Sequence, residues 1–443
     1  MPMENMPQPT IIVIIGITGD LSRRYLLPAI ETIVAAGAAP KDLIVLGVTR
    51  RKVSSQEVIA GLKNGGDHTF LREHLQMCQM DLAQKKDYAV LEQHLQTIEA
   101  GFGSAAQRLF YMSVPPQVSQ PVVELLGTSG LAAHPYTKLL LEKPFGTDLA
   151  SAQELVTQTK THFQEDQVYR IDHYLAKEMA QNLIVFRSSN SLFKRTWNKD
   201  FIERIDILSS EHIGIEGRSS FYEQTGALRD VVQSHLLQLA ALSLMKTPDV
   251  YHFEAVPHLR LEALKHLHAD VPAVRGQYQN YRDEVHNPES EVETFASITL
   301  RSTDPTWQNV PIHISTGKAL DKKATEIHIT YKKDEKHEAN KLVIRLQPNE
   351  GVGVKLWTKI PGYEWRVEQH DLDMTFRDIF TDLPEAYERV FLDAINSDHT
   401  LFTTSDEVLE SWRILQPVQA DWEMRSDDMR FYEPGSPIDK ILL

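Results

Sequence analysis

Cysteine is nearly absent from this chain, which has a single one, Cys78, among its 443 residues. One thiol cannot close an internal disulfide or supply the several thiolates of a zinc cluster, so we expect a reduced protein without a metal site. Positive charge is also scarce, since 46 Lys and Arg stand against 61 Asp and Glu and give a net charge of −15. General binding to nucleic acid or to an anionic membrane is therefore not expected.

A basic leader and long apolar runs are missing as well. No Lys or Arg precedes the apolar run that begins at Ile11, so the N-terminus does not have the pattern of a signal peptide. That run is far shorter than the ~20 residues that cross a bilayer, and we expect a cytoplasmic protein. The composition, 42% apolar and 24% charged, excludes coiled coil and disorder, and the length predicts two or three domains.

The first third of the chain alternates apolar runs with helical stretches. Apolar runs predict buried strands at residues 11–15, 43–48, 109–114 and 138–141. Strands of this kind, separated by helices, are typical of a parallel sheet with helices on both faces. The alternation ends near residues 164–170, which predicts an α/β Rossmann-like, dinucleotide-binding domain over residues 1–172.

The remainder, residues 173–443, has a different texture. A helical stretch over 173–186 opens it, and further helices are predicted at 228–246 and 383–396. Between them, strands are predicted at residues 201–210, 292–301, 310–316, 326–332, 341–347 and 352–359. Short turns join several of these strands, so neighbours can pair antiparallel. We expect an α+β domain with a large, mainly antiparallel sheet.

A glycine turn, GITGDL at residues 16–21, follows the first predicted strand and precedes a helix. Glycines let the backbone approach a pyrophosphate, and a helix N-terminus offers free N–H groups and a positive dipole end. The turn differs from G-x-G-x-x-G, and a plain turn is the alternative. The cofactor contacts predicted from it are Gly16, Thr18, Gly19, Asp20 and Leu21.

The second predicted strand ends at Arg50 and Arg51. An acidic residue at this place binds the ribose of NAD, whereas an arginine accommodates the 2′-phosphate of NADP. The arginine pair therefore predicts NADP, with a solvated pair in a loop as the alternative.

Lys143 stands in the sequence EKPFG, at the carboxyl end of a buried strand, where ligands bind in open α/β sheets. It is predicted to face cofactor and substrate, and its bond to Pro144 is a candidate cis peptide. A surface lysine before a trans proline is the alternative.

The stretch RIDHYLAKE contains an imidazole, a phenol and an ammonium within five residues. If a helix starts here, His173 and Lys177 share a face with Tyr174 beside them, which suits a phosphate group. A generic helix surface is the alternative. Further on, His235 lies in an otherwise apolar helix, where a satisfied core histidine is the alternative to a catalyst. Asp172 is a candidate to orient it.

Together these stretches resemble the successive signature stretches of glucose-6-phosphate dehydrogenases. The resemblance runs in order from residue 11 to about residue 435 and includes GITGDL, GVTRR, LLLEKPFG, YRIDHYLAKEMAQNL and GIEGRSSFYEQTGALRDVVQSHLLQL. It implies oxidation of the C1 hydroxyl of glucose 6-phosphate to 6-phosphogluconolactone with NADP, the first step of the oxidative pentose phosphate pathway. It also implies a homodimer or homotetramer, with residues 173–443 binding substrate and forming the oligomer.

The resemblance also implies roles for individual residues. His235 is the general base on the C1 hydroxyl and Asp172 orients it, which agrees with the near-neutral pKa of an ordinary imidazole. The residues implied in substrate binding are His173, Tyr174 and Lys177 for the 6-phosphate, Glu211, Asp230, Lys318 and Lys323 for the sugar, and Lys143 as a bridge to the nicotinamide.

Two departures from the family accompany the resemblance. Most members have Lys or Arg, associated with the sugar phosphate, where this chain has Tyr25, and Arg24 is the candidate substitute. The sequence ends at Leu443, so the second, structural NADP site of longer members is not expected. A dehydrogenase of another hexose phosphate and a catalytically silent NADP(H)-binding regulator are the competing functions. Intact Asp172 and His235 argue against the silent protein.

Overall fold

A computed structural model describes residues 8–63, 66–248, 253–333, 335–380, 383–425 and 428–443. Residues 1–7, on which the expected absence of a signal peptide depends, lie outside this part. Contacts group the chain into two units, the first made of Met1–Gly146, Ala150–Ala176 and Pro384–Ser405, and the second of the remaining segments. The sequence predicted a domain boundary after residue 172. In the structure, residues 173–176 and 384–405 group with the first unit as well.

The first unit is built on a seven-stranded sheet in the order β16-β6-β5-β4-β1-β2-β3. Every neighbouring pair is parallel except β16 with β6. The central strand, Thr10–Ile15, is buried along its whole length, as expected for a strand covered on both faces. The strands are β1 (Thr10–Ile15), β2 (Leu43–Thr49), β3 (Leu75–Gln79), β4 (Gln107–Met112), β5 (Thr137–Leu141), β6 (Val168–Ile171) and β16 (Phe402–Thr403).

Helices connect these strands. They are η1 (Ser22–Leu26), α1 (Leu27–Ala35), α2 (Ser55–Ala60), α3 (Thr69–His74), α4 (Lys85–Phe102), α5 (Pro116–Thr128), η2 (Leu131–Ala133), α6 (Leu149–His162), η3 (Glu165–Gln167) and α13 (Ala386–Ile395). The last of them comes from far along the chain and packs on α1 and β4. The buried ammonium of Lys138 donates to the carbonyls of Ala394 (2.5 Å) and Ile395 (3.2 Å) at the end of α13, and so holds this segment in the unit.

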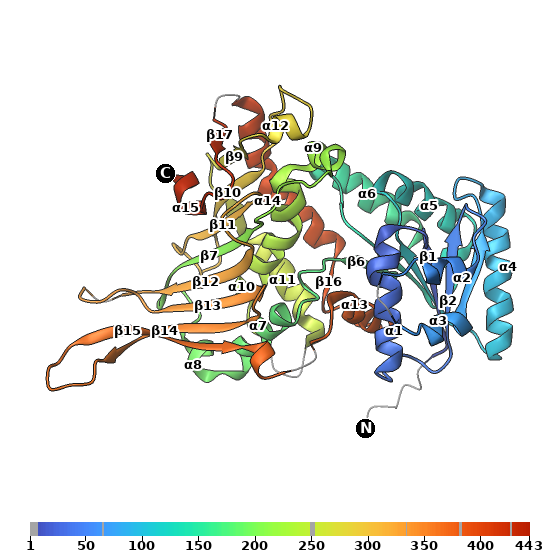
Figure 1. Cartoon of the computed structure of the whole chain (residues 1–443), viewed down its shortest axis with the longest axis horizontal. Helices are drawn as coiled ribbons and strands as arrows, with labels where there is room; N and C mark the ends of the chain where they lie inside the picture. The colour runs from blue at the N-terminus through green and yellow to red at the C-terminus, as the bar shows by residue number, and fades with distance from the viewer. Residues whose placement is uncertain (1–7, 64–65, 249–252, 334, 381–382, 426–427) are drawn as a thin grey trace. The chain divides into compact units, whose positions relative to one another are not determined.

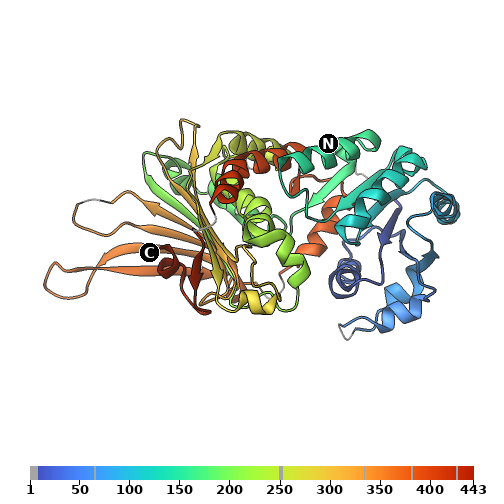
Figure 2. The same cartoon turned by 90° about the horizontal axis from the view of Figure 1, so that it is seen from above.

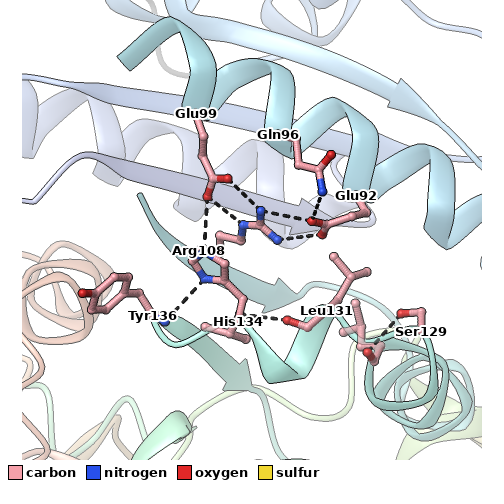
Figure 3. A network of polar contacts seen from close by, with 10 residues as sticks. Glu92, Gln96, Glu99, Arg108, Ser129, Leu131, His134 and Tyr136 are labelled. Atoms are coloured by element: carbon pink, nitrogen blue, oxygen red, sulfur yellow. Dashed lines mark hydrogen bonds and ion pairs between the residues drawn. The ribbon is translucent and has the colours of Figure 1, made fainter. Parts of the chain in front are cut away.

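A second buried cation joins β4 to α4. Arg108 is buried on β4, and its guanidinium donates to the carboxylates of Glu92 and Glu99, about two turns apart on α4, at 2.7–3.3 Å (Figure 3). His134 lies 3.5 Å from the same Glu99 carboxylate. Charge-assisted bonds of this kind satisfy a guanidinium that burial would otherwise penalise.

The second unit is built on a ten-stranded sheet in the order β15-β14-β13-β12-β7-β11-β10-β9-β17, with β8 paired to β10. Only β7 with β11 and β9 with β17 are parallel, so the prediction of a large, mainly antiparallel sheet is confirmed. The strands are β7 (Ile202–Ser210), β8 (Leu267–Ala269), β9 (Val274–Tyr278), β10 (Phe295–Ser302), β11 (Ile312–Gly317), β12 (Ala324–Tyr331), β13 (Lys341–Gln347), β14 (Gly351–Lys359), β15 (Val367–Thr375) and β17 (Arg430–Tyr432).

The longer helices of this unit gather on one face of its sheet, with α10 buried along its whole length (Figures 1 and 2). A fully buried ion pair, Arg260 with Glu407 at 2.7 Å, joins α11 to α14. The helices are α7 (Glu178–Ser189), α8 (Ser191–Thr196), α9 (Ser219–Ala227), η4 (Leu228–Leu236), α10 (Leu237–Leu244), η5 (Phe253–Ala255), α11 (Val256–Lys265), α12 (Tyr281–Glu284), η6 (Phe376–Asp378), α14 (Ser405–Met424) and α15 (Ile438–Leu442). None of the helices in the described ranges combines the length and the apolar character that crossing a bilayer requires.

Candidate active site

The predicted glycine turn lies where the first strand ends. Gly16 has φ +92°, and its N–H donates to the carbonyl of Val48 at 3.0 Å. A Cβ on Gly16 would lie 2.3 Å from the carbonyl oxygen of Ser113, which follows β4. The N–H of Gly19 donates back to Gly16 O at 2.9 Å, and a helix begins directly afterwards. The turn therefore runs as close to its neighbours as backbone permits, and only glycine fits at residue 16.

The other residues predicted from this turn are now placed. Thr18 is half-buried in the turn, Asp20 is exposed with its carboxylate 2.7 Å from the Arg24 Nε, and Leu21 precedes the π-helix η1. A close backbone approach at a helix N-terminus suits a pyrophosphate. The chemistry of the turn therefore fits the expected dinucleotide.

Arg50 and Arg51 follow β2, which pairs parallel with β1 so that Val48 lies opposite Ile15. Both arginines are exposed, and the Arg51 N–H donates to Thr49 Oγ1 at 3.2 Å. Two guanidiniums at the same sheet edge as the glycine turn are the donors that a phosphate monoester requires.

Lys143 lies at this carboxyl edge as well, after β5, and the expected cis bond to Pro144 is confirmed. Its neighbour Glu142 accepts hydrogen bonds from the hydroxyls of Tyr111 and Tyr387. None of these three residues was predicted from the sequence to belong to the site. Burial raises the pKa of the Glu142 carboxyl. Tyr387 comes from the segment that joins this unit from residues 384–405, which is why no local pattern pointed to it.

Asp172 is buried directly after β6, again at the carboxyl edge. Its Oδ1 accepts the N–H of Tyr174 at 2.9 Å, and its carbonyl accepts the N–H groups of Leu175 and Ala176. These bonds make a single turn, and the backbone of Lys177 after it is extended (φ −70°, ψ 140°), so the prediction of a helix from residue 173 is wrong.

The helix α7 starts at Glu178, so Lys177 is its N-cap residue rather than part of a helical face shared with His173. His173 and Tyr174 lie in the preceding turn, with ring centroids 5.1 Å apart. The Lys177 ammonium donates to Gln347 Oε1 at 2.6 Å, and Gln347 Nε2 donates to Thr325 Oγ1. Gln347 was not predicted, although it stands at the end of a predicted strand.

In the second unit, two predicted sugar-binding residues, Glu211 and Lys318, lie beside a buried tyrosine, Tyr222. The Lys318 ammonium lies 2.5 Å from a Glu211 carboxylate oxygen and 5.2 Å from the centre of the Tyr222 ring. Burial raises the pKa of Tyr222 well above its usual value, and the negative charges of Asp230, Glu293 and Glu211 raise it further. The sequence predicted Glu211, Asp230 and Lys318 but missed Tyr222.

His235 is 2% exposed on η4, the helix that also carries Asp230. Lys323 is exposed in the loop before β12. The carboxyl edge of the first sheet therefore brings together the glycine turn, Arg50, Lys143 and Asp172. The second unit brings together Glu211, Asp230 and Lys318. The pairing of Asp172 with His235 stays a prediction.

A glycine turn and paired arginines at the edge of a parallel sheet, followed by a polar cluster in an α+β domain, define a nucleotide-dependent oxidoreductase. Comparison with known families agrees with this class. The family model of the glucose-6-phosphate dehydrogenase NAD binding domain matches residues 13–182, and that of the C-terminal domain matches residues 184–439. The chain belongs to the glucose-6-phosphate dehydrogenase family.

Curated relatives cover nearly the whole chain. The chain is 34% identical to the glucose-6-phosphate 1-dehydrogenase of Chlamydia muridarum, over 94% of this chain and 90% of that protein. It is also 34% identical to the cytoplasmic glucose-6-phosphate 1-dehydrogenase 5 of Arabidopsis thaliana, over 92% and 85%. A solved glucose-6-phosphate dehydrogenase in complex with glucose 6-phosphate has a TM-score of 0.91 at 29% identity and covers 99% of this chain and 97% of its own.

Proposed function

We propose that this protein oxidises D-glucose 6-phosphate at C1 to 6-phospho-D-glucono-1,5-lactone, with transfer of hydride to NADP+. The observation that carries the proposal is the cluster around Tyr222. Glu211 follows β7 and Lys318 follows β11, and the two form an ion pair beside the buried Tyr222 ring. Asp230 lies on η4, and its negative charge contributes to the raised pKa of Tyr222. Carboxylates and an ammonium in one place can bind the hydroxyls of a sugar.

When bound, NADP+ supplies the acceptor for the hydride. Gly16 and Gly19 hold the turn that would approach the pyrophosphate, and the Arg50 guanidinium would bind the 2′-phosphate. Arg51 is exposed beside it and adds positive charge. The cofactor is proposed to be NADP rather than NAD because no carboxylate follows β2, where an acid would bind the free 2′-hydroxyl of NAD.

Chemistry at C1 requires a base, because the hydroxyl must lose its proton as the hydride leaves. His235 is proposed to accept this proton, and Asp172 is proposed to hold the imidazole and to stabilise its protonated form. Lys143 would bridge sugar and nicotinamide from the carboxyl edge. His173, Tyr174 and Lys177 would bind the 6-phosphate, and Lys323 would complete the sugar site.

The proposal extends to the state and location of the protein. A homodimer or homotetramer is supported by apolar side chains that the β14–β15 hairpin exposes, among them Leu356, Leu372 and Met374. A cytoplasmic location is supported by the similarity to the cytoplasmic glucose-6-phosphate 1-dehydrogenase 5 of Arabidopsis thaliana. Light scattering coupled to gel filtration tests the first of these, because a monomer at micromolar concentration would contradict it.

The reaction is tested by following absorbance of the reduced nicotinamide with glucose 6-phosphate and either NADP or NAD. Parallel reactions with glucose, mannose 6-phosphate and fructose 6-phosphate test the substrate. Turnover with glucose 6-phosphate and NADP, abolished in His235→Asn, is the expected result. Faster turnover of another hexose phosphate would replace the substrate. Cofactor binding without turnover of any sugar would favour a silent regulator.

A further inference from the structure

The helix that carries Asp230 and His235 begins after a glycine, Gly226, whose backbone conformation other residues rarely adopt. Gly226 has φ +65° and ψ −179°, a region that glycine alone populates. A Cβ added there would lie 2.4 Å from Glu293 Oε1, well inside contact distance. The carboxyl of Glu293 therefore lies against the backbone at the point where the helix starts.

Glu293 also bonds to the start of the helix. Its Oε1 accepts the N–H of Leu228 at 2.8 Å, and its carbonyl oxygen accepts the N–H of Ala227 at 3.0 Å. The first N–H groups of a helix have no partner within it, and a carboxyl placed there satisfies them. Glu293 is 7% exposed, and burial raises the pKa of its carboxyl, while the charges of Arg229 and Arg275 oppose that rise.

The helix that Glu293 bonds to is wound as a π-helix over Leu228–Leu236. Asp230 and His235 are five residues apart. In an α-helix such residues point about 140° apart around the axis. In a π-helix each N–H bonds to the carbonyl five residues back, so residues five apart are closer to one face than they are in an α-helix. The wide winding therefore turns positions 230 and 235 toward the same side of the helix.

We propose that Glu293 is a positioning residue for this pair. By fixing the N–H groups of Ala227 and Leu228 beside Gly226, its carboxyl sets where the π-winding begins, and so sets the direction in which Asp230 and His235 point. Glu293 acts through the helix and does not itself contact the reacting atoms. The inference rests on the proposed function, in which Asp230 binds the sugar and His235 takes the C1 proton.

Three substitutions separate a hydrogen-bond acceptor from a charge. Glu293→Gln keeps an acceptor at the same reach and should retain kcat within about threefold. Glu293→Asp withdraws the carboxyl by one methylene and should lower kcat about tenfold, and Glu293→Leu removes the acceptor and should lower kcat about 10²-fold, as expected for a misplaced base. The Kd for NADP should not change in any of them, since the predicted cofactor residues lie in the first unit.

A matched control is Glu223→Leu. Glu223 lies on α9, and its carboxylate accepts hydrogen bonds from Tyr281, Asn287 and Ser290. Its loss should lower the thermal midpoint and leave kcat unchanged. A merely structural Glu293 would behave in the same way, and full kcat in folded Glu293→Leu would overturn the inference. So would an Asp variant that matches the parent while the Gln variant is inactive, because charge rather than reach would then matter. If the Leu variant does not fold, the Gln and Asp variants decide.

The activity of the parent protein distinguishes failure of the proposed function from failure of the positioning role. A parent that turns over glucose 6-phosphate, with His235→Asn inactive and Glu293→Leu fully active, overturns the positioning role alone. A parent that turns over no sugar overturns the proposed function. The positioning role is then read from the ring resonances of His235, observed by NMR on protein with labelled histidine. These resonances should shift in Glu293→Leu and not in Glu223→Leu, and unshifted resonances would overturn the role.

Discussion

The candidate sites of the two units share one feature, a glycine turn before a π-helical segment, but different groups lie against that turn in each unit. In each, a glycine with positive φ leads into a π-helical segment, Gly16 before η1 and Gly226 before η4. In each, a Cβ on that glycine would meet an oxygen from another element. In the first unit this oxygen is the backbone carbonyl of Ser113, at 2.3 Å, and in the second it is the carboxyl of Glu293, at 2.4 Å.

This difference, a backbone carbonyl against a side-chain carboxyl, explains which of the two turns can be predicted from the sequence. A turn held by backbone needs only a strand, glycines and a following helix, and this pattern is local. A turn held by a side chain needs a particular residue about 65 positions away in the chain. Local sequence patterns therefore predict the first site. The residues of the second site were predicted only through the resemblance to the family, and the contact of Glu293 with Gly226 becomes visible only in the folded chain.

The largest effect is expected at the second site, for His235→Asn. If His235 takes the C1 proton, kcat should fall by about 10²–10⁴-fold with little change in the KM for glucose 6-phosphate. A core histidine would instead cost stability and leave kcat per folded molecule unchanged. Steady-state kinetics together with the thermal midpoint separates the two. His313→Asn is the control, a half-buried histidine on β11 bonded to Thr299, and it should change stability alone.

The comparison itself is tested by placing alanine at each glycine. Gly16→Ala drives a Cβ into a backbone carbonyl that cannot yield, so we expect a loss of about 3 kcal/mol or more in stability, together with weak NADP binding. Gly226→Ala meets a side chain, which can swing aside, so its stability cost should be smaller and its loss of kcat larger. Chemical denaturation and cofactor titration measure both. Equal stability losses with equal kcat would show that the two turns are held alike.

More of the fold than of the candidate site could be predicted from the sequence. The strand expected at residues 341–347 is β13 as observed, and the carboxyl edge with Gly16 and Lys143 follows from the order of strands. Tyr222, Glu293 and Gln347 were missed because their roles depend on partners distant in sequence. Contacts of this kind produce no local periodic pattern in the sequence. The helix predicted from residue 173 is wrong because the backbone at Lys177 is extended and the helix begins only at Glu178, and the spacing of apolar residues does not show where a helix begins.

A smaller effect is expected at the exposed end of the first site. Arg50→Ala should weaken NADP binding by about 10- to 150-fold, because a charge-assisted bond to a phosphate contributes roughly 1.5–3 kcal/mol. NAD binding should scarcely change, since NAD has no 2′-phosphate. Titrations of both cofactors at the same ionic strength give the ratio. Equal losses for NADP and NAD would remove the reason for proposing NADP.

The smallest effect concerns Tyr25, which stands where most of the family has a basic residue. Its ring packs on that of Tyr387 with centroids 5.5 Å apart, and Tyr25 itself is exposed. Tyr25→Lys should lose the ring contact, about 0.5–1.5 kcal/mol of stability. It should also lower the KM for glucose 6-phosphate by about 1.4- to 5-fold, since an exposed charge contact contributes roughly 0.2–1 kcal/mol.

Tyr25→Phe keeps the ring contact, adds no charge and should leave both quantities near those of the parent. A lysine variant that loses stability with no gain in KM would show that this position does not meet the sugar phosphate. In that case the phosphate would be bound by the residues at and before the start of α7 alone.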